Sequence, residues 1–128
     1  MDNKFYVSYE AARLLKEKGY NEECDTTIDD DGELFDEKYL LNQDLPVWRC
    51  SCPTKAEVID WLESKGIIVK LSYDYQAHID NARWEYFIYT HDNDGQVEAM
   101  VCSWPEDNYY KTRLAAEEAA IIKALELL

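Results

Sequence analysis

The chain has 128 residues and a mass of 15.0 kDa, which is the size of one domain. Hydrophobic residues make up 47% of the sequence, which is enough for one core and too much for a disordered chain. The 27 acidic and 13 basic residues leave a net charge of −14 at pH 7, which argues against direct binding to nucleic acid or anionic lipid, because both need clustered positive charge.

The first helix is expected over residues 7–19. Ser8 suits the N-cap, because its hydroxyl can accept a hydrogen bond from a backbone N–H of the first turn. Gly19 stands where a left-handed residue ends many helices. The apolar residues between these ends recur at helical spacing, at Ala11, Leu14 and Leu15.

Residues 22–44 hold ten acidic residues and one basic residue, so they carry −9 of the total charge. Two β-prone runs, residues 24–28 and 33–35, flank the Asp31-Gly32 pair, a combination typical of a hairpin turn. We expect an acidic β-hairpin here, followed by a long loop over residues 36–46.

A second helix begins at Thr54, which has capping-box spacing to Glu57. Its apolar face includes Trp61 and Leu62, and Gly66 ends it. Strict apolar alternation then predicts a strand over residues 67–75.

Two more strands are expected over residues 83–90 and 97–104, joined by a tight turn at residues 93–95. The three strands should form an antiparallel meander. A last helix follows residues 108–112 and carries an apolar stripe from Leu114 to Leu128. The fold class predicted for residues 1–128 is therefore a single α+β domain: three helices packed on an antiparallel sheet of three or more strands, with the acidic hairpin attached.

The strand over residues 83–90 has aromatic residues on both alternating faces. One face should pack on helices, and the other should present Phe87 and Tyr89. Exposed aromatic patches are typical of interfaces, so this face predicts binding of a protein partner or self-association. Simple packing between strands is the plainer interpretation.

The acidic residues Asp29, Asp30, Asp31 and Glu33 form a second candidate binding surface. They could mimic phosphates for a nucleic-acid-binding protein, although high charge also serves solubility alone. Neither Asp-Gly turn fits a calcium-binding EF-hand, because the required acids at both ends of the loop are missing. We therefore predict no metal site in these turns.

The four cysteines are Cys24, Cys50, Cys52 and Cys102. Nothing marks the chain as secreted, so we expect reduced thiols and a cytoplasmic location. Only one closely spaced cysteine pair is present, which does not fit structural zinc. Cys52 precedes a helix N-terminus, which can lower a thiol pKa, so it is a candidate reactive thiol beside the interpretation as an inert one.

The common phosphate-binding and hydrolase motifs are absent from the sequence, and no cofactor is indicated. The leading hypothesis is a non-enzymatic cytoplasmic protein that binds a protein partner through the aromatic sheet face or the acidic surface. A small enzyme that uses Cys52 or buried acids is one alternative. A carbohydrate-binding module, suggested by Trp and Tyr beside acids, is another.

Three stretches of the chain resemble a group of small uncharacterised proteins encoded by gut Bacteroides-type bacteria and by their phages and prophages. They are residues 7–24, the Pro53-Thr54 opening of the helix that carries Trp61, and the C-terminal run from Ala124 to Leu128. The acidic segment and Cys50-Ser51-Cys52 depart from that group. The group has no established activity, so the resemblance implies a bacterial or phage context and no site residues.

Overall fold

The computed structural model describes residues 3–74, 83–103 and 110–128. Its helices are α1 (Tyr9–Glu17), α2 (Lys55–Ser64) and α3 (Arg113–Glu126). Its strands are β1 (Cys24–Asp29), β2 (Leu34–Leu40), β3 (Arg49–Ser51), β4 (Ile67–Asp74), β5 (Arg83–His91) and β6 (Val97–Cys102). Short 3-10 turns lie at Asn3–Phe5 and Asn42–Asp44.

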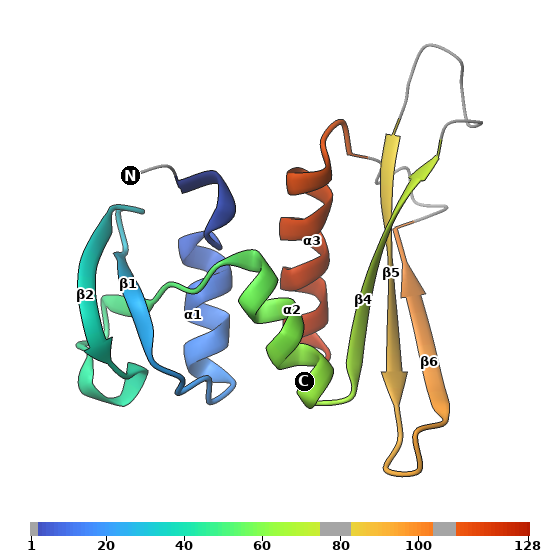
Figure 1. Cartoon of the computed structure of the whole chain (residues 1–128), viewed down its shortest axis with the longest axis horizontal. Helices are drawn as coiled ribbons and strands as arrows, with labels where there is room; N and C mark the ends of the chain where they lie inside the picture. The colour runs from blue at the N-terminus through green and yellow to red at the C-terminus, as the bar shows by residue number, and fades with distance from the viewer. Residues whose placement is uncertain (1–2, 75–82, 104–109) are drawn as a thin grey trace.

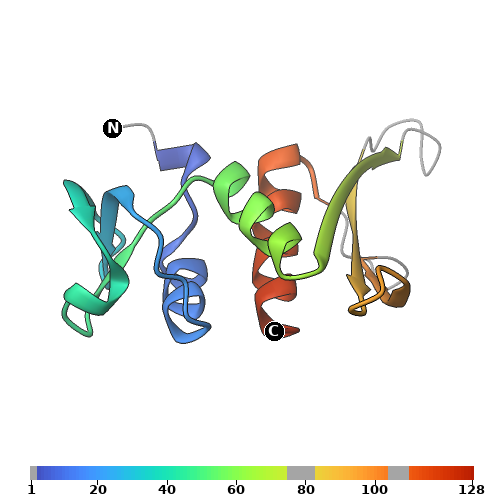
Figure 2. The same cartoon turned by 60° about the horizontal axis from the view of Figure 1, so that its bottom comes forward.

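Two antiparallel three-stranded sheets enclose the helices (Figures 1 and 2). The first sheet has the order β2-β1-β3, and the second has the order β4-β5-β6. Helix α1 packs on the first sheet, α2 and α3 pack on the second, and α1 contacts α3 between them. The predicted α+β class with three helices is confirmed, with the helices forming the middle of the molecule.

The acidic hairpin is part of a full sheet, and the long loop predicted over residues 36–46 is wrong. Strand β2 continues to Leu40 and pairs with β1 as far as Cys24. Strand β3 pairs with the other side of β1, where Ile28 lies opposite Cys50. Backbone pairing to a distant segment supplies the order here, and the local residue pattern carries no sign of it.

The helix ends follow the predicted capping chemistry. The Ser8 hydroxyl accepts a hydrogen bond from the backbone N–H of Ala11. Thr54 and Glu57 form the reciprocal capping box. Gly19 and Gly66 follow the C-caps with φ angles of 87° and 81°, which favour glycine.

The second sheet turns one face toward the helices. Directly paired residues in antiparallel strands point to the same face, and Val69, Ile88 and Val101 are paired in this way. Ile88 is fully buried, and Val69 and Val101 pack against the same core. The three predicted strands are confirmed; the predicted ends at Tyr75 and Trp104, and residues 108–109 before the last helix, lie outside the described residues.

The first sheet turns Leu34, Ile28 and Cys50 toward α1 by the same logic. A single core therefore continues from one sheet through the helices to the other. This core includes residues from the first and the last helix.

Small side chains bring the helices of the middle layer close together. The alanines with no exposed surface are Ala11 and Ala12 on α1 and Ala116, Ala120 and Ala124 on α3. Because the alanine side chain is small, the helix backbones pack closely at these positions. A larger side chain there would force the helices apart.

We expect Ala120→Leu to lower the free energy of unfolding by about 1–3 kcal/mol, because it overpacks a filled layer. The matched control is Ala115→Leu, which adds the same side chain at an exposed position of α3 and should change stability by less than about 0.5 kcal/mol. Urea denaturation followed by circular dichroism measures both. Equal denaturation midpoints for the two variants would contradict this packing.

Candidate functional site

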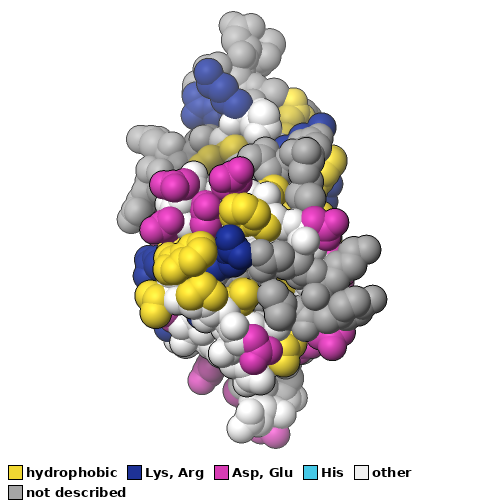
Figure 3. Space-filling view, turned by 90° about the vertical axis from the view of Figure 1, so that its left-hand side faces the viewer, with side chains coloured by type: hydrophobic (Ala, Val, Ile, Leu, Met, Phe, Trp, Pro, Cys, Tyr) yellow, Lys and Arg dark blue, Asp and Glu magenta, His cyan; other side chains and the backbone are white. Residues whose placement is uncertain are grey.

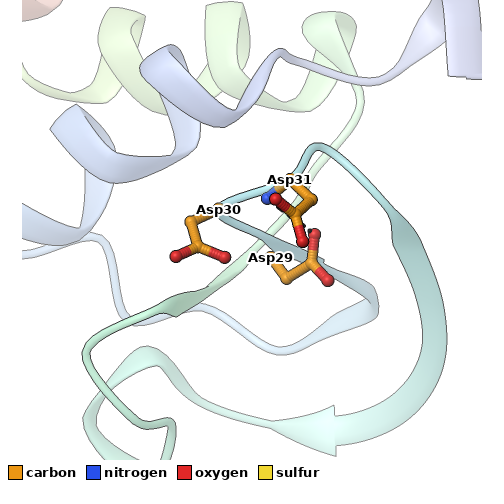
Figure 4. A group of neighbouring side chains, drawn as sticks. All are labelled: Asp29, Asp30 and Asp31. Atoms are coloured by element: carbon orange, nitrogen blue, oxygen red, sulfur yellow. Dashed lines mark hydrogen bonds between the residues drawn. The ribbon is translucent and has the colours of Figure 1, made fainter.

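The acidic residues of the β1–β2 hairpin form the tip of the turn (Figure 4). Asp29 Oδ1 accepts hydrogen bonds from the backbone N–H groups of Asp31 at 3.0 Å and Glu33 at 2.9 Å. The backbone N–H of Asp29 in turn donates to the Glu33 carbonyl oxygen. Asp29 is therefore a structural residue of the turn, whereas Asp30, Asp31 and Glu33 are exposed.

The β5–β6 hairpin repeats this turn with the same chemistry. Asp92 Oδ1 accepts from the backbone N–H groups of Asp94 and Gln96, both at 2.9 Å. The two turns share an Asp-x-Asp-Gly sequence, with Gly32 and Gly95 at φ angles of 81° and 78°. Turn formation thus explains the first aspartate and the glycine in each motif, without a ligand.

The carboxylate oxygens of Asp29, Asp30 and Asp31 lie within 4.8 Å of one another. One oxygen of Asp29 is already held by two backbone N–H groups. The geometry of this cluster follows from the turn, so it does not by itself define a cation site.

We expect Asp29→Ala to destabilise the protein by about 1–3 kcal/mol, because two backbone N–H groups lose a charged acceptor. Asp30→Ala removes the same charge at the adjacent exposed position and should leave stability within about 0.5 kcal/mol of the wild type. Thermal unfolding monitored by circular dichroism compares the two variants. A loss of the same size in both would show that charge, and not the turn, is responsible.

The second candidate surface is the face of the second sheet that points away from the helices. Phe87 and Tyr89 alternate with the buried Tyr86 and Ile88, so they lie on this face and are partly buried. Two cross-strand rows form the face, Ile68–Tyr89–Met100 and Lys70–Phe87–Cys102. We call these six residues the outer β4–β6 face.

The described helices all lie on the opposite side of this sheet (Figures 1 and 2). Strand β6 is at its edge and is the most exposed of its strands, with Met100 54% and Val97 60% exposed. Edge strands with exposed apolar side chains are unusual in isolated proteins, because they invite pairing and association.

Exposed apolar side chains also lie beside the first sheet, in the turn just before β3, and the sequence interpretation missed them. Trp48 is 49% exposed and Val47 is 90% exposed. The Arg49 guanidinium lies 4.3 Å from the centre of the Phe35 ring and 4.8 Å from that of Trp48. Figure 3 shows this side of the molecule, where hydrophobic side chains lie beside basic ones and acidic side chains lie nearby.

Arg49 covers part of this aromatic surface. Its guanidinium lies over both the Phe35 and the Trp48 ring, so one face of each ring is not open to a stacked sugar. The signal that could have revealed this surface is the pair Val47-Trp48 directly after Pro46, since connecting segments run over the surface and large apolar side chains there are exposed.

Cys52 lies in the core behind the start of α2. It has no exposed surface, and its thiol donates a hydrogen bond to the Val7 carbonyl oxygen at 3.3 Å. Burial raises the pKa of Cys52 to about 12, the opposite of the lowering expected from a helix N-terminus. A thiol with this pKa holds very little thiolate at neutral pH.

The remaining cysteines are also free. Burial raises the pKa of Cys24 to about 11 and raises the pKa of Cys50 as well. Cys102 is the one cysteine that is partly exposed. Buried acids were a further enzymatic possibility. Among the described residues, the buried acids are Asp29, which serves the turn, and Glu117, whose carboxylate lies 3.7 Å from the Arg113 guanidinium on the same helix.

We expect iodoacetamide to modify Cys102 first in the folded protein, with Cys52 protected until the chain unfolds. The reason is that alkylation needs an accessible thiolate, and Cys52 is both buried and high in pKa. Mass spectrometry of labelled peptides with and without urea measures the order. Cys102→Ser serves as the control; rapid labelling of Cys52 in this folded variant would contradict the structure.

No family model matches the chain, and no curated protein or solved structure is detectably similar to it. The resemblance to small proteins of Bacteroides-type bacteria and their phages therefore stays a prediction. Within the described residues, none of the helices has the length and apolar character needed to cross a membrane.

Proposed function

We propose that this protein is a non-catalytic binding protein that docks a basic protein partner on its outer β4–β6 face. The observation that carries this proposal is the pair of cross-strand rows, Ile68–Tyr89–Met100 and Lys70–Phe87–Cys102, on the side away from the helices. Aromatic residues and methionine are the side chains most enriched at the centre of protein interfaces.

The charge of the chain favours a basic partner over a second copy of itself. Each chain carries −14, so two copies repel one another before their sheet faces meet. A basic protein is attracted over the same distance, which raises its association rate. The two apolar rows then provide the contacts that keep it bound. The exposed carboxylates of Asp30, Asp31 and Glu33 contribute to this attraction.

The cytoplasm is the location that we propose for this interaction. All four cysteines are free, although three of them are buried in one core. Reduced thiols are the usual state in the cytoplasm, where disulfides rarely persist. A phage or prophage origin would fit a small binding protein that acts on a host component.

The test is a capture experiment with tagged protein in bacterial lysate, followed by purification of the captured protein and a binding measurement by calorimetry. We expect Tyr89→Thr combined with Met100→Thr to weaken binding at least tenfold, because it removes two of the three apolar side chains of one row while threonine keeps the strand. Raising the salt concentration should also weaken binding, since part of the attraction is electrostatic.

The matched control is Trp48→Thr, which removes an exposed aromatic residue beside the first sheet and should bind the captured protein as the wild type does. Unchanged affinity in the Tyr89/Met100 variant would rule out this face. Binding that is lost only when Asp30, Asp31 and Glu33 are neutralised would instead assign the function to the acidic turn.

A further inference from the structure

A cavity of about 340 Å³ opens where the chain enters α1. It lies between the β1–β2 hairpin and the first residues of α1 and α2, with α3 at one wall. Val7, Ile28 and Leu34 make part of its wall apolar, and Lys55 and Glu118 bring one charge of each sign. Cavities of this size are typical of small-molecule sites.

Glu118 has one carboxylate oxygen in use and one without a partner. Its Oε1 accepts a hydrogen bond from the backbone N–H of Ser8 at 3.0 Å, which ties α3 to the start of α1. Its Oε2 is buried and accepts no hydrogen bond from the residues that the structure describes. Buried carboxylate oxygens are rarely left in this state, because the loss of water is then not compensated.

Lys55 supplies the opposite charge, and its ammonium does not use all of its hydrogen-bond donors. It is only 6% exposed, and its ammonium donates to the carbonyl oxygens of Lys4 at 2.6 Å and Tyr6 at 3.0 Å. An ammonium carries three N–H donors, so the third makes no hydrogen bond within the described part of the chain. Among the described residues, Lys55 and Glu118 do not form an ion pair with each other, although both line this cavity.

We propose that this cavity binds a free α-amino acid with an aliphatic side chain. The ligand's ammonium would donate to Glu118 Oε2, and its carboxylate would accept from the remaining N–H of Lys55. The aliphatic side chain would lie against Val7, Ile28 and Leu34. A simple amine would leave the lysine donor unpaired, and a simple carboxylate would leave the glutamate oxygen unpaired, so only a molecule with both groups completes the site.

This inference goes beyond the proposed docking function and uses none of its residues. The cavity is lined by the hairpin of the first sheet and by the starts of the helices, whereas the outer β4–β6 face lies on the second sheet. Each proposal can therefore fail while the other holds.

The test is isothermal titration calorimetry of the whole protein with L-leucine, valine, isoleucine and methionine. We expect saturable one-to-one binding of at least one of them. Two matched probes then dissect leucine: 3-methylbutan-1-amine lacks its carboxylate, and 4-methylpentanoate lacks its amino group. Each should bind at least about tenfold more weakly than leucine, because each leaves one buried charged group unpaired.

Three variants assign the contacts. Glu118→Gln should abolish the preference for leucine over 4-methylpentanoate, and Lys55→Met should abolish the preference for leucine over 3-methylbutan-1-amine. Since Lys55 also holds the N-terminal segment, Leu34→Trp is the second route: it fills the cavity and keeps both charged groups. Circular dichroism confirms that each variant is folded, and Tyr89→Thr, on the other sheet, should bind leucine as the wild type does.

Two results would overturn the proposal. One is the absence of a saturable heat signal for all four amino acids at concentrations up to about 10 mM. A dissociation constant above that concentration is weaker than a dedicated site would have. The other is amino-acid binding that is unchanged in both Glu118→Gln and folded Leu34→Trp, since the ligand would then lie elsewhere.

Discussion

The fold depends on one constraint: two three-stranded sheets must bury their apolar faces on helices that pack on one another, α1 under the first sheet and α2 and α3 under the second. Neither sheet is large enough to make a core alone, and each has only one apolar face turned inward. Alanines without exposed surface on α1 and α3 let the layers approach closely. The hydrogen bond from the Ser8 backbone N–H to Glu118, across 110 positions of sequence, ties the start of α1 to α3.

The acidic character of the chain has two origins that the structure separates. Asp29 and Asp92 are turn residues whose carboxylates hold backbone N–H groups of their own hairpins. Asp30, Asp31 and Glu33 are exposed and shape only the field around the molecule. The number of acidic residues in the sequence thus overstates the size of a possible binding site, because some of these residues stabilise the turns of their own hairpins.

Placing the helices inside leaves both sheets with an outer face. The second sheet presents Phe87, Tyr89 and Met100 there, and Trp48 lies beside the first sheet under the Arg49 guanidinium. The starts of α1 and α2 meet beside the β1–β2 hairpin, and the cavity lined by Lys55 and Glu118 lies at this junction. The exposed outer β4–β6 face and the cavity are therefore both consequences of placing the helices between the two sheets.

The sequence by itself determined the helices, their caps, the hairpin turns and the alternation that puts Phe87 and Tyr89 opposite Tyr86 and Ile88, because each depends on neighbours within a few residues. Only the tertiary structure decided that β2 continues beyond Phe35 to Leu40 along β1 and that Arg49–Ser51 pairs with the other side of β1, since the local residue pattern shows neither pairing. It also decided that Cys52 is a buried thiol of raised pKa, where the helix N-terminus alone suggested the reverse. Glu118 and Lys55 came to line one cavity for the same reason: desolvation and proximity are set by the packing of segments far apart in the chain, and local sequence does not record them.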